Sequence, residues 1–301
     1  MHVLTSSVII CTRNRRDDLI VCLQSIAIQT VRPTQLIIVD SSDTPVKTDA
    51  SVALICAQMQ RNNTQVITLH TAPGLPFQRN KGIAQAQADI VYFFDDDVQL
   101  ESTYLGLMNA TFARYPDFLG GMGCVKNIFP RPKAKYRLFR TLFLLSQDYA
   151  SGSFTWSGMP THVFGSDHWQ SVEVLSGCCM AYRRRVFTKH LFDEHLGGYA
   201  YMEDCDFSAR VSSDGPLFFN PEAGLFHFHS PVSRDAVVKN KAMLIHNYSY
   251  LFFKNFYPKN RLKIIAYAWS ILGLFLEALL VRRWHYIRGY VQGLRRFYIQ
   301  S

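Results

Sequence analysis

The chain has 301 residues, of which 48% are hydrophobic and 14% aromatic, and a formal net charge of +9. This composition excludes a disordered chain, and the ordinary numbers of glycine (17) and proline (12) exclude collagen-like and proline-rich sequences. Most of the charge lies at the C-terminal end, where residues 254–301 contain nine basic residues and one acid. Because the rest of the chain is nearly neutral, we expect no nucleic-acid partner.

The first 125 residues are predicted to alternate strands with helices. We expect strands over residues 3–11, 36–39, 66–69 and 90–94, and helices over residues 15–28, 49–60, 77–88 and 101–115. Asn14 is the expected N-cap of the first helix. This alternation predicts an α/β fold with a Rossmann-like, mostly parallel central sheet, which binds its ligands at the carboxyl ends of the strands.

The second part of the chain is less periodic. Residues 126–170 are aromatic and polar, and are expected to form an irregular insertion. We expect a strand over 172–181, a helix over 205–212, a short strand over 225–229 and helices from 233 to the end. The predicted domain boundary therefore falls after residue 232.

An apolar segment over residues 264–281 contains one charge, Glu277, and is long enough to span a membrane. Basic residues on both sides disfavour a true span, since one basic flank would have to cross. We therefore favour a helix lying in the membrane interface or a re-entrant hairpin. A helix buried against the protein and a true span remain alternatives.

The following segment predicts a basic amphipathic helix that binds an anionic membrane surface. Its apolar stripe consists of Trp284, Ile287, Val291, Leu294 and Tyr298, while three arginines fall off that stripe. The alternative is that the stripe packs on the protein and the arginines face solvent. Seven cysteines without a CxxC pair and an N-terminus without a signal peptide predict reduced thiols and a cytoplasmic protein.

Three consecutive carboxylates, Asp95, Asp96 and Asp97, follow the predicted strand that ends at residue 94. Carboxylates crowded at the end of a buried strand repel one another, and a divalent cation such as Mn²⁺ or Mg²⁺ would offset that repulsion. A surface acidic turn is the alternative. The segment therefore predicts a metal site that could also bind phosphates.

A second acidic group, Glu203 and Asp204, lies at the start of a predicted helix. One of these carboxylates could serve as a general base toward an incoming hydroxyl. Alternatively, the acids only complement the helix dipole, and Asp206 pairs with Arg210 on the helix surface.

Histidines and basic residues complete the candidate site. His227 and His229 alternate along a predicted strand, so both would face one way, and one of them could bind the metal or contact phosphate. Arg79 and Lys81 lie near a predicted helix N-terminus, a place that favours anions. Structural histidines and solvated basic residues are the alternatives.

The first strand-to-helix turn carries Thr12, Arg13 and Asn14, and the second strand ends at Asp40. These groups could hold a base and a ribose. The sequence contains neither a GxGxxG nor a GxxxxGK[ST] motif, which excludes a standard dinucleotide fingerprint and a P-loop.

Taken together, these motifs resemble the family 2 glycosyltransferases, which have the GT-A fold. The resemblance covers about residues 5–230 and rests on segments that occur in the family's order: VIICTRNR from Val8, IVDSSD from Ile38, QRNKG from Gln78, DDD from Asp95, GCCM from Gly177 and EDCDF from Glu203. It implies a GT-A domain over residues 1–232, with a nucleotide-binding half (1–125) and an acceptor half (126–232). The C-terminal region 233–301 looks like the helical tails of bacterial members that build surface polysaccharides.

The resemblance also implies roles for individual residues. The nucleoside would be held by Thr12, Arg13, Asn14 and Asp40, with Arg79 near the base or phosphate. Asp95 and Asp96 would lie near the ribose and the metal. The ion, Mn²⁺ or Mg²⁺, would be bound by Asp97, with Asp95 nearby and with His227 or His229 completing its shell.

Asp204 would be the catalytic base, and Glu203 and Lys81 are further candidate site residues. The implied reaction moves a sugar from a nucleotide-sugar donor to a hydroxyl of a glycan or lipid-linked acceptor, with inversion, at the inner face of the plasma membrane. A nucleotidyltransferase of similar fold and a non-catalytic membrane-surface adaptor remain the alternatives.

Overall fold

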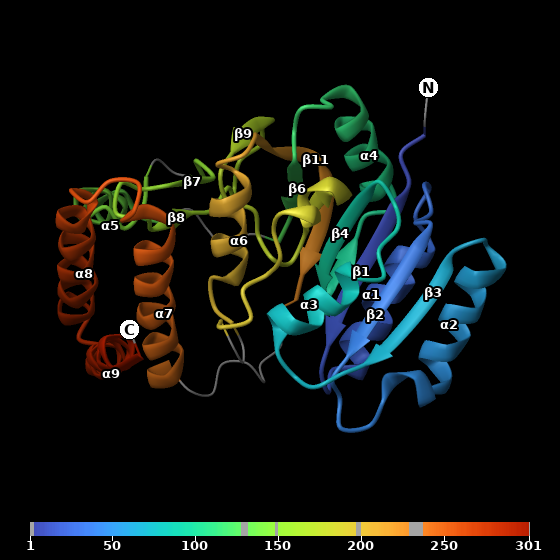
Figure 1. The fold of residues 1–301 in the computed structure, drawn as a ribbon, viewed down its shortest axis with the longest axis horizontal. Helices are drawn as coiled ribbons and strands as arrows, with labels where there is room; N and C mark the ends of the chain where they lie inside the picture. The colour runs from blue at the N-terminus through green and yellow to red at the C-terminus, as the bar shows by residue number, and fades with distance from the viewer. Residues whose placement is uncertain (1–2, 128–131, 148–149, 197–199, 229–236, 301) are drawn as a thin grey trace.

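A computed structural model describes residues 3–127, 132–147, 150–196, 200–228 and 237–300. Figure 1 shows an α/β body at one end of the molecule and a group of C-terminal helices at the other. The sheet has nine strands within the described residues, in the order β3-β2-β1-β4-β10-β6-β11-β5, with β9 paired to β11. This arrangement confirms the predicted α/β, GT-A-like fold.

The first half of the sheet is entirely parallel, and its strands and helices alternate as predicted. The elements are β1 (Ser6–Thr12), α1 (Arg16–Ala27), β2 (Gln35–Asp40), α2 (Ala50–Arg61), β3 (Gln65–His70), α3 (Leu75–Ile83) and β4 (Ile90–Asp95). The register places Cys11 beside Asp95 and Thr12 beside Asp40. The carboxyl ends of the three neighbouring strands therefore meet at one edge.

The second half of the sheet is mixed. Its elements are β5 (Val98–Leu100), α4 (Tyr104–Arg114), β6 (Gly120–Val125), β9 (Gln170–Val172), β10 (Met180–Arg183) and β11 (Leu217–His227). Strand β10 runs antiparallel between β4 and β6, while β11 is parallel to β6 and antiparallel to β5 and β9. The strands of this half continue the sheet beyond β4, and β11 ends at His227, one of the predicted site residues.

Several predicted boundaries were wrong. The strand expected over 172–181 is two strands, because β9 ends at Val172 and β10 begins at Met180. The helix expected over 77–88 ends at Ile83, the helix expected over 101–115 begins at Tyr104, and the strand expected over 225–229 begins at Leu217. The loop between β9 and β10 matters most, since it crosses the site.

Strand β6 was not predicted because its glycines resemble a turn. A Cβ atom on Gly121 would lie 2.4 Å from the Phe218 ring, and one on Gly120 would lie 2.5 Å from the Tyr182 ring. The glycines therefore make room for large aromatic rings from neighbouring strands.

The prediction that Asn14 caps the first helix is also wrong. Asn14 has a φ of 55°, and the N-cap position is Arg15, without a side-chain cap bond. Instead, the Asn14 side chain donates to the Asp43 carboxylate and accepts from its backbone N–H, both at 2.9 Å. Asn14 thus joins the β1–α1 turn to the loop that follows β2.

A second hydrophobic core joins the middle of the chain to the C-terminal helices. It is built by α5 (Ala134–Leu142), the short strand β7 (Ser153–Phe154), α6 (Glu203–Val211), α7 (Val237–Leu251), a π-helical turn (Phe252–Phe256), α8 (Lys263–Leu280) and α9 (Trp284–Gln300). Strand β7 pairs with β8 (Pro160–Thr161) in a separate two-stranded sheet. The segment 126–170, expected to be irregular, therefore contains a helix.

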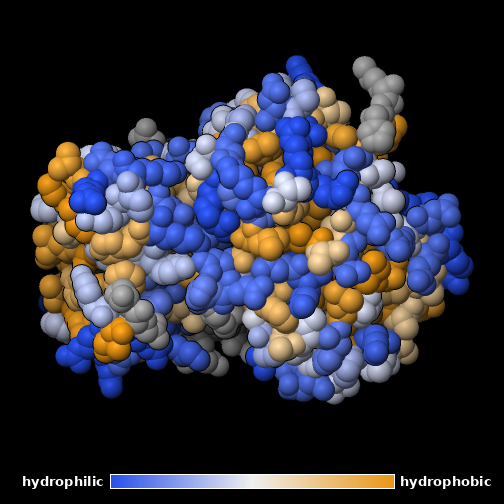
Figure 2. Space-filling view, in the orientation of Figure 1, coloured by the Kyte–Doolittle hydropathy of each residue, from blue (hydrophilic) through white to orange (hydrophobic). Residues whose placement is uncertain are grey.

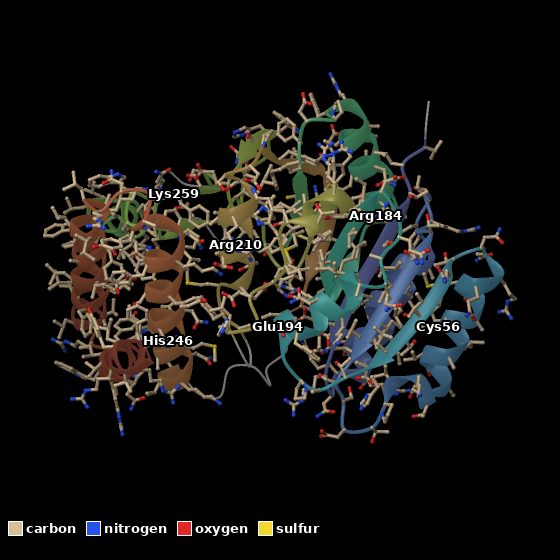
Figure 3. All side chains as sticks on the ribbon, viewed as in Figure 1. Cys56, Arg184, Glu194, Arg210, His246 and Lys259 are labelled. Atoms are coloured by element: carbon tan, nitrogen blue, oxygen red, sulfur yellow. The ribbon has the colours of Figure 1, made fainter. Side chains whose placement is uncertain are left out.

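A buried charge network fixes α6 against the end of α7. Asp206 is fully buried and accepts hydrogen bonds from Arg210 at 2.9 Å, Lys254 at 3.0 Å and Asn255 at 2.8 Å. Figure 3 shows Arg210 on α6, between the sheet and α7. The pair between Asp206 and Arg210, considered as an alternative, does form, but Asp206 is buried at the junction between α6 and the C-terminal helices and does not lie on the helix surface.

Helix α8 has a buried face and an exposed apolar face. Ala266, Ser270 and Leu274 are buried, while Ile265, Leu272 and Leu280 are exposed. Figure 2 shows apolar residues along the edge of the molecule where Figure 1 places α8. Among the described residues, α8 is the one helix long and apolar enough to cross a membrane, with a mean hydropathy of 1.7.

Helix α9 packs on α7 through a face other than the apolar stripe that we expected to bind a membrane. Gly289, Tyr290, Gly293 and Phe297 form its buried face, while Trp284, Val291 and Tyr298 are exposed. Two glycines allow the backbones to come close: a Cβ atom on Gly293 would lie 2.2 Å from the Ala242 carbonyl oxygen. Much of the predicted apolar stripe therefore faces away from the protein.

Candidate active site

A cavity of about 1410 Å³ opens at the carboxyl ends of β1 and β4. Its walls come from the β1–α1 turn, the start of α3, the carboxylates after β4, the β9–β10 loop and the start of α6. The cavity continues to residues of α5, α7, α8 and α9. It therefore reaches from the predicted nucleotide-binding half to the C-terminal helices.

Asp95, Asp97 and His227 form a candidate metal site in this cavity. One ligand atom from each lies within 4.8 Å of the others. His227 Nε2 is 2.9 Å from Asp97 Oδ1 and 3.9 Å from Asp95 Oδ2. The pairing of β11 with β5 sets His227 opposite Val98 and so brings the imidazole to the carboxylates.

The electrostatics of this cluster favour the ionised pair. Burial by itself would raise the pKa of Asp97, but the hydrogen bond and charge of His227, together with Arg15, lower it to about 2. Burial likewise opposes a charged His227, yet the hydrogen bond to Asp97 raises the pKa of this imidazole to about 11. The imidazolium therefore pairs with the Asp97 carboxylate, and it would have to release a ring proton before its nitrogen could bind a metal ion.

Arg15 offsets part of the negative charge of the aspartates. Its guanidinium lies 2.8 Å from Asp96 and 2.5 Å from Asp97, and Thr12 donates its hydroxyl to Asp96 at 2.7 Å. Burial nevertheless raises the pKa of Asp96 to about 7. The repulsion among the aspartates, from which we predicted a bound cation, is thus partly compensated by the chain's own basic residues.

The second acidic group is organised by the backbone of Gly177. The Gly177 carbonyl accepts a hydrogen bond from Arg79 at 3.1 Å, and its N–H donates to Asp204 Oδ2 at 2.8 Å. The other Asp204 oxygen accepts from the Cys205 N–H at 2.8 Å. Asp204 is therefore held in one orientation at the wall of the cavity.

Glu203 is used differently from its neighbour Asp204. Its carboxylate is buried and forms an ion pair with Arg79, which also lies 3.5 Å from Asp95. Burial acts to raise the pKa of Glu203, and the charge of Arg79 opposes this shift. The guanidinium of Arg79 is thus shared between two acids and the Gly177 carbonyl.

The other predicted site residues lie in different surroundings. Arg13 and Asn14 line the cavity and are exposed. The Asp40 carboxylate is buried and accepts hydrogen bonds from the N–H groups of Ser42 and Val46, both at 2.8 Å. Lys81 is exposed, with its amine 5.0 Å from the centre of the Phe77 ring, and His229 lies outside the described residues. Neither Asp40 nor Lys81 is among the described residues that line the cavity.

His162 is a cavity residue that the sequence did not indicate. Its ring stacks on Phe164 at 5.2 Å between centroids, and its buried Nδ1 has no hydrogen-bond partner among the described residues. Burial lowers the pKa of this imidazole, while the charge of Asp204 acts in the opposite direction. A histidine inside an irregular segment offers no motif or spacing by which it could have been found.

The sequence pattern of one family covers much of the same region. The glycosyl transferase family 2 pattern matches residues 7–191. The chain belongs to glycosyl transferase family 2. This membership favours the predicted glycosyltransferase over a nucleotidyltransferase or a non-catalytic adaptor. A search of curated proteins found no match.

Solved structures of glycosyltransferases share the fold. GalNAc-T7 with UDP, GalNAc and Mn²⁺ has a TM-score of 0.63 and 16% identity, over 85% of this chain and 50% of that one. The mannosyltransferase PcManGT from Pyrobaculum calidifontis, in complex with GDP-Man and Mn²⁺, has a TM-score of 0.60 and 15% identity, over 98% and 88%. Residues 1–349 of S. aureus TarS have a TM-score of 0.54 and 17% identity, over 90% and 72%.

The chain spans half the length of the GalNAc-T7 structure and 40% of a longer TarS structure. At these identities the likeness shows a common fold. The substrates of this chain have to be argued from its own residues.

Proposed function

We propose that the chain is an inverting, metal-dependent glycosyltransferase that moves a sugar from a nucleotide-sugar donor to a hydroxyl of a glycan or lipid-linked acceptor. One observation carries this proposal: the Asp95–Asp97–His227 cluster and the oriented Asp204 carboxylate line the same cavity. A diphosphate bound at the cluster would place its sugar within the cavity that Asp204 faces. In this proposal residues 1–232 form the transferase domain, with residues 1–125 binding the donor and residues 126–232 the acceptor.

The candidate metal site fits Mn²⁺ or Mg²⁺ by its chemistry. Two carboxylate oxygens suit both ions, and the imidazole of His227 adds a ligand that Mn²⁺ accepts. GalNAc-T7 and PcManGT are both solved with Mn²⁺ and a nucleotide or nucleotide sugar. When bound, such an ion would offset the charge of the departing nucleoside diphosphate.

For the donor, we assign the nucleoside to the β1–α1 turn. Thr12, Arg13 and Asn14 line the cavity there, beside Asp95 and Asp96, which we place near the ribose. Within this arrangement Asp40 acts by holding the backbone of the loop after β2, and Arg79 by holding Glu203 and Asp95 in place.

Asp204 is the proposed general base. Hydrogen bonds from two backbone N–H groups fix its carboxylate at the cavity wall, while its side chain stays partly exposed. It would remove the proton from the acceptor hydroxyl as that oxygen attacks the anomeric carbon. Attack from the side opposite the diphosphate inverts the anomeric configuration. Glu203, in contrast, is occupied by Arg79.

We also propose that the C-terminal helices bind the cytoplasmic, anionic face of the plasma membrane, where surface polysaccharides or glycolipids are made. The exposed apolar face of α8, including Ile265 and Leu272, would enter the interface. Lys263 begins that helix and Arg282 follows its end, and each well-placed basic residue contributes about 1 kcal/mol on an anionic leaflet.

The test is turnover with a panel of nucleotide sugars in the presence of Mn²⁺ or Mg²⁺, read as release of nucleoside diphosphate. Asp204→Asn should lower transfer by about 10²–10⁴-fold, the usual contribution of a general base, while donor affinity stays close to wild type. Asp17→Asn, at an exposed position on α1, is the matched control. Full turnover by Asp204→Asn would refute the assignment, and the anomeric configuration of the product tests inversion.

A further inference from the structure

The far end of the cavity is lined by basic residues from three separate elements: Arg140 of α5, Lys241 of α7 and Arg283, which precedes α9. We propose that these residues form a subsite for the phosphate or diphosphate group of a lipid-linked acceptor. This inference rests on the proposed function, because it names the class of acceptor for the same cavity.

The three basic side chains are gathered around two tyrosine rings. The Lys241 amine lies 4.3 Å and the Arg283 guanidinium 5.1 Å from the centre of the Tyr286 ring. The Arg140 guanidinium lies 5.7 Å from the Tyr136 ring and pairs with Glu277 at 3.0 Å. Aromatic rings hold cations in place without neutralising them.

Charge at this end of the cavity is unbalanced. Glu277 is the one acid among the described residues that line it, against the basic side chains of Arg140, Lys241 and Arg283. Burial lowers the pKa of Lys241; Tyr286 and Glu277 oppose this shift, while the charges of Arg140 and Arg283 add to it. A phosphate would relieve this repulsion, since phosphate oxygens accept hydrogen bonds from several cations at once.

The surroundings of this subsite suit a lipid. Val281 lines the cavity and is 51% exposed, and its neighbours Leu280 and Trp284 are 72% and 67% exposed. They continue the exposed apolar face of α8. A hydrocarbon chain leaving the phosphate would therefore lie along apolar side chains, while the sugar on the other side would extend into the cavity toward Asp204.

The probe is farnesyl diphosphate, with inorganic pyrophosphate and farnesol as its polar and apolar halves. Binding is measured by calorimetry on the full chain. EDTA is present so that no metal ion at the Asp95–Asp97–His227 cluster can bind the diphosphate. Farnesyl diphosphate should bind more than about ten-fold more tightly than either half. Lys241→Gln and Arg283→Gln should each weaken its binding by about ten-fold or more, as for a lost charge-assisted hydrogen bond.

Two further variants distinguish binding at this subsite from a general effect of net charge and from misfolding of the variants. Arg288→Gln removes an exposed charge from α9 that does not line the cavity, and should leave binding unchanged. Lys241→Arg keeps the charge and should retain most of the affinity. An equal loss with Arg288→Gln would overturn the subsite, and so would an absence of binding by the wild type.

Anionic vesicles provide the last comparison. If Lys241→Gln and Arg283→Gln weaken binding to phosphatidylglycerol vesicles but not to farnesyl diphosphate, these residues contact the membrane surface and the subsite is refuted. Release of nucleoside diphosphate by the wild type tests the proposed transfer reaction independently of the subsite. Turnover without variant-sensitive farnesyl diphosphate binding refutes the subsite alone, whereas variant-sensitive binding without turnover on any donor refutes the transfer reaction alone.

Discussion

Arg79 on α3 and Glu203 on α6 form an ion pair from which solvent is almost excluded, with side chains 3% and 6% exposed. The pair joins the first half of the sheet to the helix that carries Asp204. Gly177 lies directly against it, since a Cβ atom there would be 3.0 Å from Arg79 Nη2 and 3.1 Å from Glu203 Oε1. This buried ion pair therefore helps to fix the cavity wall formed by α3 relative to the wall formed by α6.

Removing one partner of this pair should be strongly destabilising. Glu203→Ala leaves the Arg79 guanidinium buried beside Asp95 without its main partner, which we expect to lower the free energy of unfolding by about 3–5 kcal/mol. Urea unfolding measures the loss. Asp17→Ala, at an exposed pair on α1, is the control and should change stability by less than about 0.5 kcal/mol. A small effect of Glu203→Ala would show that solvent reaches Arg79.

Metal binding should depend on Asp97 itself. Asp97→Ala removes one of the three ligand groups and the hydrogen-bond partner of His227, and should weaken Mn²⁺ binding by at least about 10–100-fold. Calorimetry with MnCl₂ alone, without donor, measures this directly. Asp18→Ala, whose carboxylate also pairs with Arg15 but lies outside the metal cluster, is the control. Equal affinity of wild type and Asp97→Ala would contradict the site.

The sequence predicted which residues carry the chemistry of the site better than it predicted which residues pair with one another. Asp95, Asp97 and Asp204 stand in local motifs, because a strand followed by acids and a helix that begins with acids are visible along the chain. Pairing between Arg79 and Glu203 is not visible, since 124 residues separate them and only the folded sheet brings them together.

The same reason explains the missed elements. Strand β6 was not predicted because its glycines are required by contacts far along the chain. They leave space for the rings of Tyr182 and Phe218, which come from later strands. The face by which α9 packs on α7 was not predicted, because periodicity ranks side chains by polarity, whereas Gly289 and Gly293 are buried by a close approach to α7. Local sequence patterns reveal which positions are hydrophobic. The glycines in β6 and α9 are instead determined by the shape of the element packed against them, which is distant in the sequence.

Stability near neutral pH should depend on His162. Burial lowers the pKa of this imidazole in the folded chain, so the unfolded chain binds its proton more readily. Folding is therefore penalised as the pH falls through about 6.5, the ordinary value for histidine, toward the lowered pKa. Unfolding midpoints in urea from pH 8 to pH 5 should fall more steeply for the wild type than for His162→Gln. His168→Gln, at an exposed position, should follow the wild type.

The packing of α9 on α7 gives a test of the C-terminal helices. Gly293→Val would place its first side-chain carbon 2.0 Å from Ile245 Cγ2 and 2.2 Å from the Ala242 carbonyl oxygen, so the helices must separate. We expect a loss of about 1–3 kcal/mol, as for other overpacked sites, measured as a lower urea midpoint. Gln292→Val adds the same side chain at the adjacent, exposed position and is the matched control. If both variants unfold at the same urea concentration, α9 is not held against α7 by this face. A selective loss with Gly293→Val would show that α9 packs on α7 through its glycine face, the arrangement in which Trp284, Val291 and Tyr298 are exposed.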